Sequence, residues 1–310
     1  MTTLTDSYPS RTGTAPSPAI LPRKDPVIWT TDSTSLAKGP LTTQQIREFS
    51  DHGFLFLDSL FSDLEVQQLR TELNALAAQP QICASPACIL EPNGNAVRSI
   101  FHVHRHSRVF ESLAADRRLL GAAEQILGDL VYVHQSRVNF KPGFRGEEFY
   151  WHSDFETWHM EDGMPRMRAV SFSLLLTENN AFNGPLMLIP GSHRKFVACA
   201  GQTPADHFQH SLRKQEIGIP DDESLRTLVN EGGIVAPCGK AGSLLIFDCN
   251  IMHGSAGNLS PWPRSNVFIV LNSFENRLGT PFCGMPPRPE FIAAREVDQP
   301  ETIAAHAATR

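Results

Sequence analysis

Apolar residues recur at helical spacing through much of the first 130 positions of the chain. The spacing predicts helices over residues 41–52, 64–78 and 107–128, and an unbroken apolar run predicts a buried strand over residues 54–57. Ser62 followed by Glu65 forms a capping box, which marks the start of the second helix. Residues 1–25 are rich in Ser, Thr and Pro and have few large apolar side chains, so we expect a flexible tail.

After residue 130 the pattern changes to short runs that are typical of strands. These runs cover residues 131–139, 170–177, 186–189, 243–247 and 266–273, with Gly, Pro and Asn clustered between them. Such strands predict a sandwich or barrel, and helices gathered ahead of strands predict an α+β, mainly β fold. The polar residues 200–230 predict an insertion with some helix. We expect one domain over residues 26–310, with a helical part to about residue 130 and a strand-rich core over about 131–280.

Composition argues against several classes of partner. The formal net charge of −6 gives no basic excess for nucleic acid. No apolar run approaches the roughly 20 residues that a membrane helix needs. The first residues lack the basic and apolar stretches of a secretory signal, so we expect a cytoplasmic protein. The six cysteines form no CxxC pair, which favours free thiols over a structural zinc site.

A candidate metal site begins with His152 and Asp154, and His253 follows far along the chain. Residues i and i+2 of a strand point the same way, so this pair can reach one ion together, and His253 can close the site from another strand. Two imidazoles and one carboxylate leave coordination positions open, as non-haem Fe(II) oxygenases require. An HxD tripeptide alone is common in loops, but here it follows the glycine-rich turn at residues 142–146.

An arginine supports the same chemistry. Arg264 lies eleven residues beyond His253, and a guanidinium can hold the distal carboxylate of 2-oxoglutarate through two parallel hydrogen bonds. Ser255 can add a hydroxyl on the same face. On its own Arg264 would be a solvated surface charge, and the neighbouring triad reverses that interpretation.

Other polar residues near the motif leave alternatives open. His102, His104 and His106 alternate and could line one side of a strand, but no carboxylate pattern accompanies them, so a ligand role is disfavoured. His134, His159 and His193 are expected to form hydrogen bonds. Glu156, His159, Glu161 and Asp162 form either a solvated loop or a layer that supports the site.

Residues 149–165 read FYWHSDFETWHMEDGMP and resemble the signature FxWHSDFETWHxEDGMP of the ectoine hydroxylases at every defined position. The larger group is the phytanoyl-CoA-dioxygenase-like branch of the 2-oxoglutarate oxygenases, which shares only the HxD pair, the distal histidine and the arginine. The resemblance extends over residues 41–288. It implies a double-stranded β-helix, or jelly roll, with flanking helices, and a possible homodimer.

The resemblance also implies roles for individual residues. His152, Asp154 and His253 would be the catalytic iron ligands, and Phe149, Asn139, Ser255 and Arg264 would hold 2-oxoglutarate. The ectoine pocket would be lined by Gln135, Arg137, Trp158, Ser171, Phe247 and Phe268. Ectoine is a zwitterion with a cationic ring, which aromatic faces attract, and its carboxylate would meet Arg137 or Ser171. For Phe247 and Phe268 the alternative role is core packing.

The implied reaction is Fe(II)- and 2-oxoglutarate-dependent hydroxylation of ectoine to 5-hydroxyectoine, with O2 consumed and succinate and CO2 released. This enzyme would act in compatible-solute synthesis. The carboxylate of Asp154 disfavours a halogenase, which needs a vacant metal position. Two alternatives remain: a hydroxylase of another small zwitterion or amino acid such as proline, and a non-catalytic binding protein on a jelly-roll scaffold.

Overall fold

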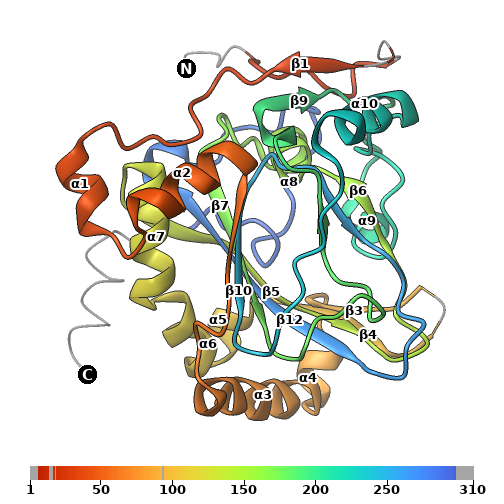
Figure 1. Cartoon of the computed structure of the whole chain (residues 1–310). Helices are drawn as coiled ribbons and strands as arrows, with labels where there is room; N and C mark the ends of the chain where they lie inside the picture. The colour runs from red at the N-terminus through yellow and green to blue at the C-terminus, as the bar shows by residue number, and fades with distance from the viewer. Residues whose placement is uncertain (1–5, 14–16, 18, 93, 298–310) are drawn as a thin grey trace.

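Two β-sheets form the centre of the molecule in the computed structural model, which describes residues 6–13, 17, 19–92 and 94–297 (Figure 1). The larger sheet has seven antiparallel strands in the order β2-β10-β7-β12-β5-β4-β3. Their bounds are β2 Phe54–Leu57, β3 Cys88–Leu90, β4 Val97–Phe101, β5 Val131–Lys141, β7 Ala169–Leu175, β10 Leu244–Asp248 and β12 Arg264–Ser273. The smaller sheet has the order β6-β11-β8, with bounds β6 Phe149–His152, β8 Met187–Leu188 and β11 His253–Ser255.

Alternating side chains of the larger sheet build two separate apolar layers. In β10, Leu244 and Ile246 join the core shared with the helices, whereas Leu245 and Phe247 join a cluster with Leu188 of the smaller sheet. This is the period of two expected for a strand that is covered on both faces. The second cluster therefore fills the space between the two sheets, which is the arrangement of a jelly roll and confirms the predicted fold class.

Most helices precede the strands that form the centre of the sheet. Their bounds are α1 Ser33–Lys38, α2 Thr43–His52, α3 Asp63–Ala77, α4 Pro80–Cys83, α5 Val103–His106, α6 Arg108–Ala114 and α7 Arg117–Leu127. The capping box of Ser62 and Glu65 is confirmed at the start of α3. The single helix predicted over residues 107–128 is wrong, because Asp116 caps a new helix there and divides the segment into α6 and α7. α7 packs against β5, β7 and β12.

Later in the chain, short helices interrupt the strands. They are α8 Asp154–Thr157, the π-helical turn η1 Trp158–Asp162, the 3-10 turns η2 Ser192–Arg194 and η3 Phe274–Asn276, α9 Phe208–Ser211 and α10 Asp222–Gly232. α9 lies within the predicted polar insertion at residues 200–230 and α10 overlaps its end, so the insertion contains some helix as expected. The N-terminal part is not purely helical, because β2, β3 and β4 all precede residue 130 and belong to the larger sheet.

The expected flexible tail is wrong for residues 6–13 and 19–25, while residues 1–5, 14–16 and 18 lie outside the described part of the chain. Strand β1 (Ile20–Pro22) pairs with β9 (Lys195–Val197) along the upper edge of Figure 1. Tyr8 is 1% exposed and Arg11 is 4% exposed. The Ser-, Thr- and Pro-rich composition suggested a flexible segment, but a few large side chains, placed far apart, are enough to anchor it.

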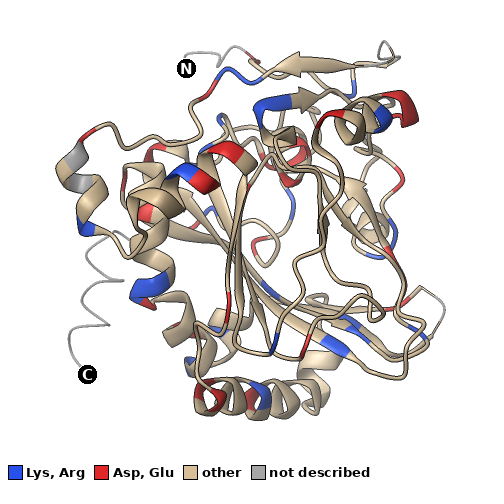
Figure 2. Cartoon of the chain, in the orientation of Figure 1, with Lys and Arg blue, Asp and Glu red and all other residues tan. Residues whose placement is uncertain are grey.

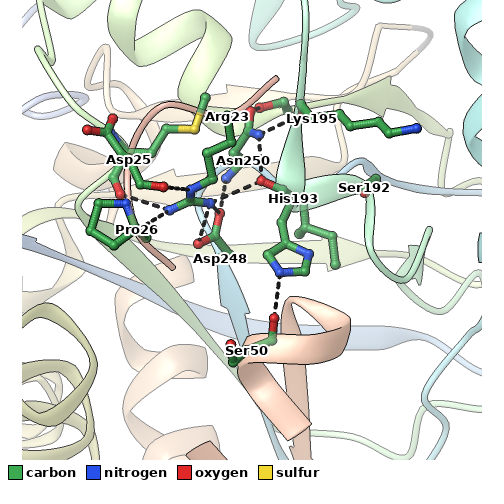
Figure 3. Close-up of polar contacts among 12 residues, drawn as sticks. Arg23, Asp25, Pro26, Ser50, Ser192, His193, Lys195, Asp248 and Asn250 are labelled. Atoms are coloured by element: carbon green, nitrogen blue, oxygen red, sulfur yellow. Dashed lines mark hydrogen bonds and ion pairs between the residues drawn. The ribbon is translucent and has the colours of Figure 1, made fainter. Parts of the chain in front are cut away.

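Arg23 is one of these anchors (Figure 3). Its guanidinium donates to both carboxylate oxygens of Asp248 at 2.8 and 2.9 Å, and to the backbone carbonyls of His193, Asp25, Pro26 and Met167. Asn250 donates to the carbonyls of His193 and Lys195 in the same cluster. The N-terminal segment is thereby fixed to the end of β10.

Charged residues of both signs are interspersed over the helices and loops (Figure 2). Among the residues that the structure describes, no helix combines the length and the apolar character needed to span a membrane.

Candidate iron and substrate site

Three potential metal ligands converge where the smaller sheet meets α8. β11 pairs antiparallel with β6, so His253 lies directly opposite His152. One ligand atom from each of His152, Asp154 and His253 lies within 4.8 Å of the other two. Within the described ranges this is the one group of three His, Cys, Asp or Glu residues that meets this test for a shared ion.

The expected strand geometry of His152 and Asp154 needs a correction. β6 ends at His152 and α8 begins at Asp154, so the pair spans a junction between a strand and a helix. Two contacts hold this junction against the turn that leads to His253: the amide of Phe155 donates to the carbonyl of Cys249 at 2.8 Å, and the hydroxyl of Ser153 donates to Asn250 Oδ1 at 3.1 Å.

Hydrogen bonds fix the protonation of both histidine rings. Nδ1 of His152 lies 2.7 Å from the carbonyl of Tyr150, and Nδ1 of His253 lies 3.0 Å from the carbonyl of Ile251. A carbonyl oxygen only accepts, so each Nδ1 carries a proton, and Nε2 is the nitrogen that each ring can offer to an ion. Both Nε2 atoms face Asp154 Oδ1, at 3.6 and 3.9 Å.

The charge state of Asp154 suits a cation. Burial alone would raise the pKa of this carboxyl, but His253 and His152 and the charge of Arg137 hold the pKa below its usual range. Burial lowers the pKa of His253 to about 4, which keeps its ring neutral at physiological pH. Asp154 Oδ2 is buried and has no hydrogen-bond partner among the residues that the structure describes. An anionic oxygen without a partner beside two free imidazole nitrogens is the donor set that Fe(II) takes.

A second, cationic end of the site lies on β5 and β12. Arg264 stands opposite Lys141 in the register of these two strands. Arg264 is 4% exposed, and its Nε and Nη1 atoms have no partner within the described chain. Lys141 Nζ donates to Ser255 Oγ at 2.8 Å and to the carbonyl of Ala256 at 2.5 Å. Burial and the nearby arginines lower the pKa of Lys141 to about 6. The charge at this end therefore comes from Arg264, whose unpartnered N–H groups suit a carboxylate.

A cavity of about 410 Å³ opens beside the metal ligands. Its wall includes eight residues considered above, His152, Asp154, Asn139, Phe149, Gln135, Arg137, Trp158 and Glu161. The opposite wall comes from the insertion, with Ser211, Leu212, Lys214, Gln215, Glu216 and Ile219. Arg137 forms no ion pair with described residues, and its side chain lies over the ring of Phe268 at 4.8 Å.

Three predicted pocket residues are buried and do not line this cavity. Phe247 and Phe268 belong to the apolar cluster between the sheets, where Phe268 lies under the guanidinium of Arg137. Phe247 still packs on the ring of His253 at 5.2 Å between centroids. Ser171 is fully buried, and its hydroxyl has no hydrogen-bond partner in the described part of the chain. Neither Ser255 nor Arg264 lines this cavity, and Arg264 lines a second cavity of about 330 Å³ together with Lys141.

The charged part of the signature is buried, so the solvated-loop interpretation is wrong. Glu156, His159, Glu161 and Asp162 are at most 3% exposed. Glu156 and Glu161 pair with Arg11, and Asp162 pairs with Arg288. The ring of His159 bonds to Asp6 and to the carbonyl of Met164. These residues form a supporting layer below the cavity.

Two predictions about other histidines also need correction. His134 was expected to form hydrogen bonds, but neither ring nitrogen has a hydrogen-bond partner among the described residues. Its Nε2 atom lies 3.9 Å from Asp162 Oδ2, and the ring packs at a steep angle against Trp158 at 4.9 Å between centroids. His102, His104 and His106 do not lie along a strand. They belong to α5 and the residue that precedes it, where His102 adopts a positive φ of 62°.

Sequence reasoning missed Lys141, Arg11 and the insertion residues that line the cavity. Lys141 was visible only as the start of a turn, and strand register is needed to place it beside Arg264. Arg11 was assigned to the tail, and no local pattern reveals a partner 145 residues away.

Comparison with known proteins agrees with this geometry. The phytanoyl-CoA dioxygenase family profile matches residues 49–266. The chain belongs to this family. An ectoine dioxygenase of Bordetella bronchiseptica is 55% identical over 291 residues, which cover 94% of this chain and 93% of that relative. An ectoine dioxygenase of Sphingopyxis alaskensis is 51% identical over 293 residues, covering 94% of this chain and 93% of that relative.

Solved structures of the family extend the match to three dimensions. The S. alaskensis protein EctD, in a crystal structure with 2-oxoglutarate and 5-hydroxyectoine, superposes with a TM-score of 0.81 at 47% identity, and the match covers 94% of this chain and 95% of that chain. A structure of the same protein with bound Fe has a TM-score of 0.80 at the same identity and coverage. The carbocyclase SnoK, at 17% identity and a TM-score of 0.61, covers 76% of this chain and 85% of its own and shares the fold.

Proposed function

We propose that this dioxygenase hydroxylates ectoine to 5-hydroxyectoine, using Fe(II), 2-oxoglutarate and O2 and releasing succinate and CO2. The proposal depends above all on the His152–Asp154–His253 group, whose two unprotonated nitrogens and one free carboxylate oxygen face each other beside the cavity. These three residues would hold the iron. Bound Fe(II), together with 2-oxoglutarate and O2, supplies the oxidising power for insertion of one oxygen atom into a C–H bond.

The chain itself binds and orients the two organic substrates. Arg264, with Lys141 and Ser255 beside it, binds the distal carboxylate of 2-oxoglutarate, because its free N–H groups are already buried and aligned. Asn139 and Phe149 connect this end to the cavity. Preorganised donors of this kind need little rearrangement when the ligand binds.

Ectoine occupies the cavity between the signature and the insertion. Trp158 offers an aromatic face to the cationic ring, and Arg137 meets the substrate carboxylate, since it lines the cavity without an ion-pair partner among described residues. Gln135 holds Arg137 through a hydrogen bond to its guanidinium and is itself held by the carbonyl of Ile292. The insertion on the opposite wall limits the access of water to the reacting atoms.

The deciding experiment is anaerobic reconstitution with Fe(II), followed by 2-oxoglutarate, O2 and ectoine. We expect ectoine to gain one oxygen atom by mass spectrometry, with one succinate formed for each product. Proline and other small zwitterions are assayed in parallel. Faster turnover of one of these compounds would transfer the assignment to a related hydroxylase, and bound iron with no turnover of any substrate would support a binding protein.

The iron assignment has its own test. His152→Ala and Asp154→Ala should each lose iron after gel filtration and lose activity by at least about a hundredfold, because each removes one of three ligands. Metal content is measured by mass spectrometry of the desalted protein. Full iron retention with normal turnover in either variant would refute the assignment.

We also propose a cytoplasmic homodimer, which stays a prediction from the sequence and the family resemblance.

A further inference from the structure

Arg11 lies between two parts of the cavity that are far apart in sequence. Its Nε and Nη2 atoms donate to the two carboxylate oxygens of Glu156, at 2.9 and 2.7 Å. Its Nη1 atom donates to Glu161 at 2.5 Å and to the hydroxyl of Thr203 at 3.0 Å. One buried guanidinium therefore joins the signature, which carries Trp158, to the start of the segment that forms the opposite wall.

The segment over residues 203–219 packs on this same guanidinium. Gly218 approaches so closely that an added Cβ would lie 2.2 Å from Arg11 Nη2 and 2.7 Å from Glu156 Oε2. His207 lies 2.9 Å from Glu161 through its Nδ1 atom, and Gln215 donates to Thr157 at 3.4 Å. Residues 211–219 of the segment then line the cavity. The wall thus depends on contacts centred on Arg11.

Hydrogen bonds hold the backbone of Arg11 in an unfavourable conformation. Its φ of 52° lies in the left-handed region, which is unfavourable for a residue with a side chain. Its amide donates to the carbonyl of Cys199 at 2.8 Å, and Ser10 donates to Glu156 at 2.6 Å. Contacts from both sides therefore maintain a strained conformation that aims the guanidinium at the carboxylates.

We propose that Arg11 is a positioning residue for the substrate, because it fixes the 203–219 wall against the helix that carries Trp158. Ectoine binds between these two surfaces, whereas 2-oxoglutarate binds at the Arg264 end, so loosening this contact affects ectoine selectively. The part of this inference that concerns ectoine rests on the proposed function. The part that concerns the wall does not.

The test uses two variants and a matched control in the full-length protein. Arg11→Lys keeps the charge but loses the planar fork. Thr203→Val removes only the hydrogen bond from the wall. Arg23→Lys is the control, because the Arg23 side chain is also enclosed, belongs to the same N-terminal segment and is paired with Asp248. Its described hydrogen-bond partners include no residue that lines the cavity.

Hydrogen–deuterium exchange measured by mass spectrometry reports on the wall without any need for turnover. Peptides covering residues 203–219 should exchange at least about threefold faster in Arg11→Lys, and more modestly faster in Thr203→Val, since local opening costs less free energy. In Arg23→Lys the same peptides should match wild type, even though the melting temperature falls. Unchanged exchange in Arg11→Lys, or equal acceleration in the control, would overturn the proposal.

Steady-state kinetics give the second measurement. The KM for ectoine should rise about fivefold or more in Arg11→Lys, while the KM for 2-oxoglutarate stays within about twofold of wild type. Equal increases in the KM values for ectoine and 2-oxoglutarate would show that Arg11 only stabilises the fold. They would refute a selective role in positioning ectoine. Should the wild-type protein leave ectoine unchanged, the proposed function fails, and the exchange measurement alone still decides whether Arg11 holds the wall.

Discussion

Arg264 carries two buried nitrogens that have no hydrogen-bond partner within the described ranges. Burial lowers its pKa only to about 10, which leaves the guanidinium charged. A bound carboxylate would supply the missing acceptors. Arg264→Ala should therefore raise the KM for 2-oxoglutarate by about a hundredfold, and the KM for ectoine by no more than about threefold. Initial rates with each substrate varied in turn check this.

Arg264→Lys is the appropriate control for that prediction. It keeps a positive charge but cannot form two parallel hydrogen bonds. Its KM for 2-oxoglutarate should therefore lie between that of wild type and that of Arg264→Ala. If alanine at this position changed both constants equally, the carboxylate would have to bind elsewhere.

Trp158 should show the opposite selectivity. It is 3% exposed and lines the cavity, with its other edge packed against His134. Trp158→Ala should raise the KM for ectoine by about tenfold or more, because the aromatic face and its shape are lost together. The KM for 2-oxoglutarate should remain nearly constant. Trp158→Phe, which keeps an aromatic face, should recover part of the loss.

Residues that belong to a recognisable sequence motif could be predicted from the sequence. The side chains of His152, Asp154 and His253 converge as predicted. Arg264 is buried, and so is not a solvated surface charge. Lys141 and Arg11 escaped prediction because their partners come from distant parts of the chain. Phe247 and Phe268 pack in the cluster between the sheets and also contact His253 and Arg137, so their substrate contact stays a prediction from the resemblance.

At the scale of elements, strand positions followed closely from hydrophobic patterning, whereas junctions did not. The predicted strand over residues 266–273 lies within β12, and the strand over 54–57 matches β2. The break between α6 and α7 and the π-helical turn η1 were not visible. Both depend on local hydrogen bonds that helical spacing does not encode.

Gly163 ends the π-helical turn that carries Trp158 and Asp162. Its φ is +73°, and an added Cβ would lie 2.5 Å from the carbonyl oxygens of Gly279 and Thr280. Gly163→Ala should therefore lower the free energy of unfolding by about 3 kcal/mol, from backbone strain and steric overlap together. Urea denaturation monitored by circular dichroism measures the loss.

Gly191 offers a matched control, because its φ is +80° and nothing lies within 4 Å of the added Cβ. Gly191→Ala should cost only the conformational strain, about 1 kcal/mol. Equal losses in the two variants would show that the contact with residues 279 and 280 contributes nothing.

At the scale of the whole molecule, a buried ionic layer ties the two ends of the described chain to the signature. Burial alone would raise the pKa of Glu161, but His207, Arg288 and Arg11 lower it to about 2 from the usual 4.5. The folded pKa is depressed, so this stabilisation is present above pH 4.5 and is lost as pH falls toward 2.

Stability should consequently fall on acidification, and Glu161→Gln should weaken that dependence. Between pH 5 and pH 3 the free energy of unfolding should fall by about 2 kcal/mol less in the variant than in wild type. Urea titrations at both pH values measure the difference. Glu48→Gln, at an exposed position of α2, is the control. An identical fall in Glu161→Gln and wild type would exclude Glu161 as a source of the acid sensitivity.

The pairing of Arg11 with Glu156 also bears on how the protein is made. The ribosome adds Glu156 145 residues after Arg11, a delay on the order of ten seconds. The nascent chain therefore contains the cation long before the carboxylates and the 203–219 segment that surround it. Arg11 therefore cannot reach its final set of partners until the 203–219 segment has been synthesised.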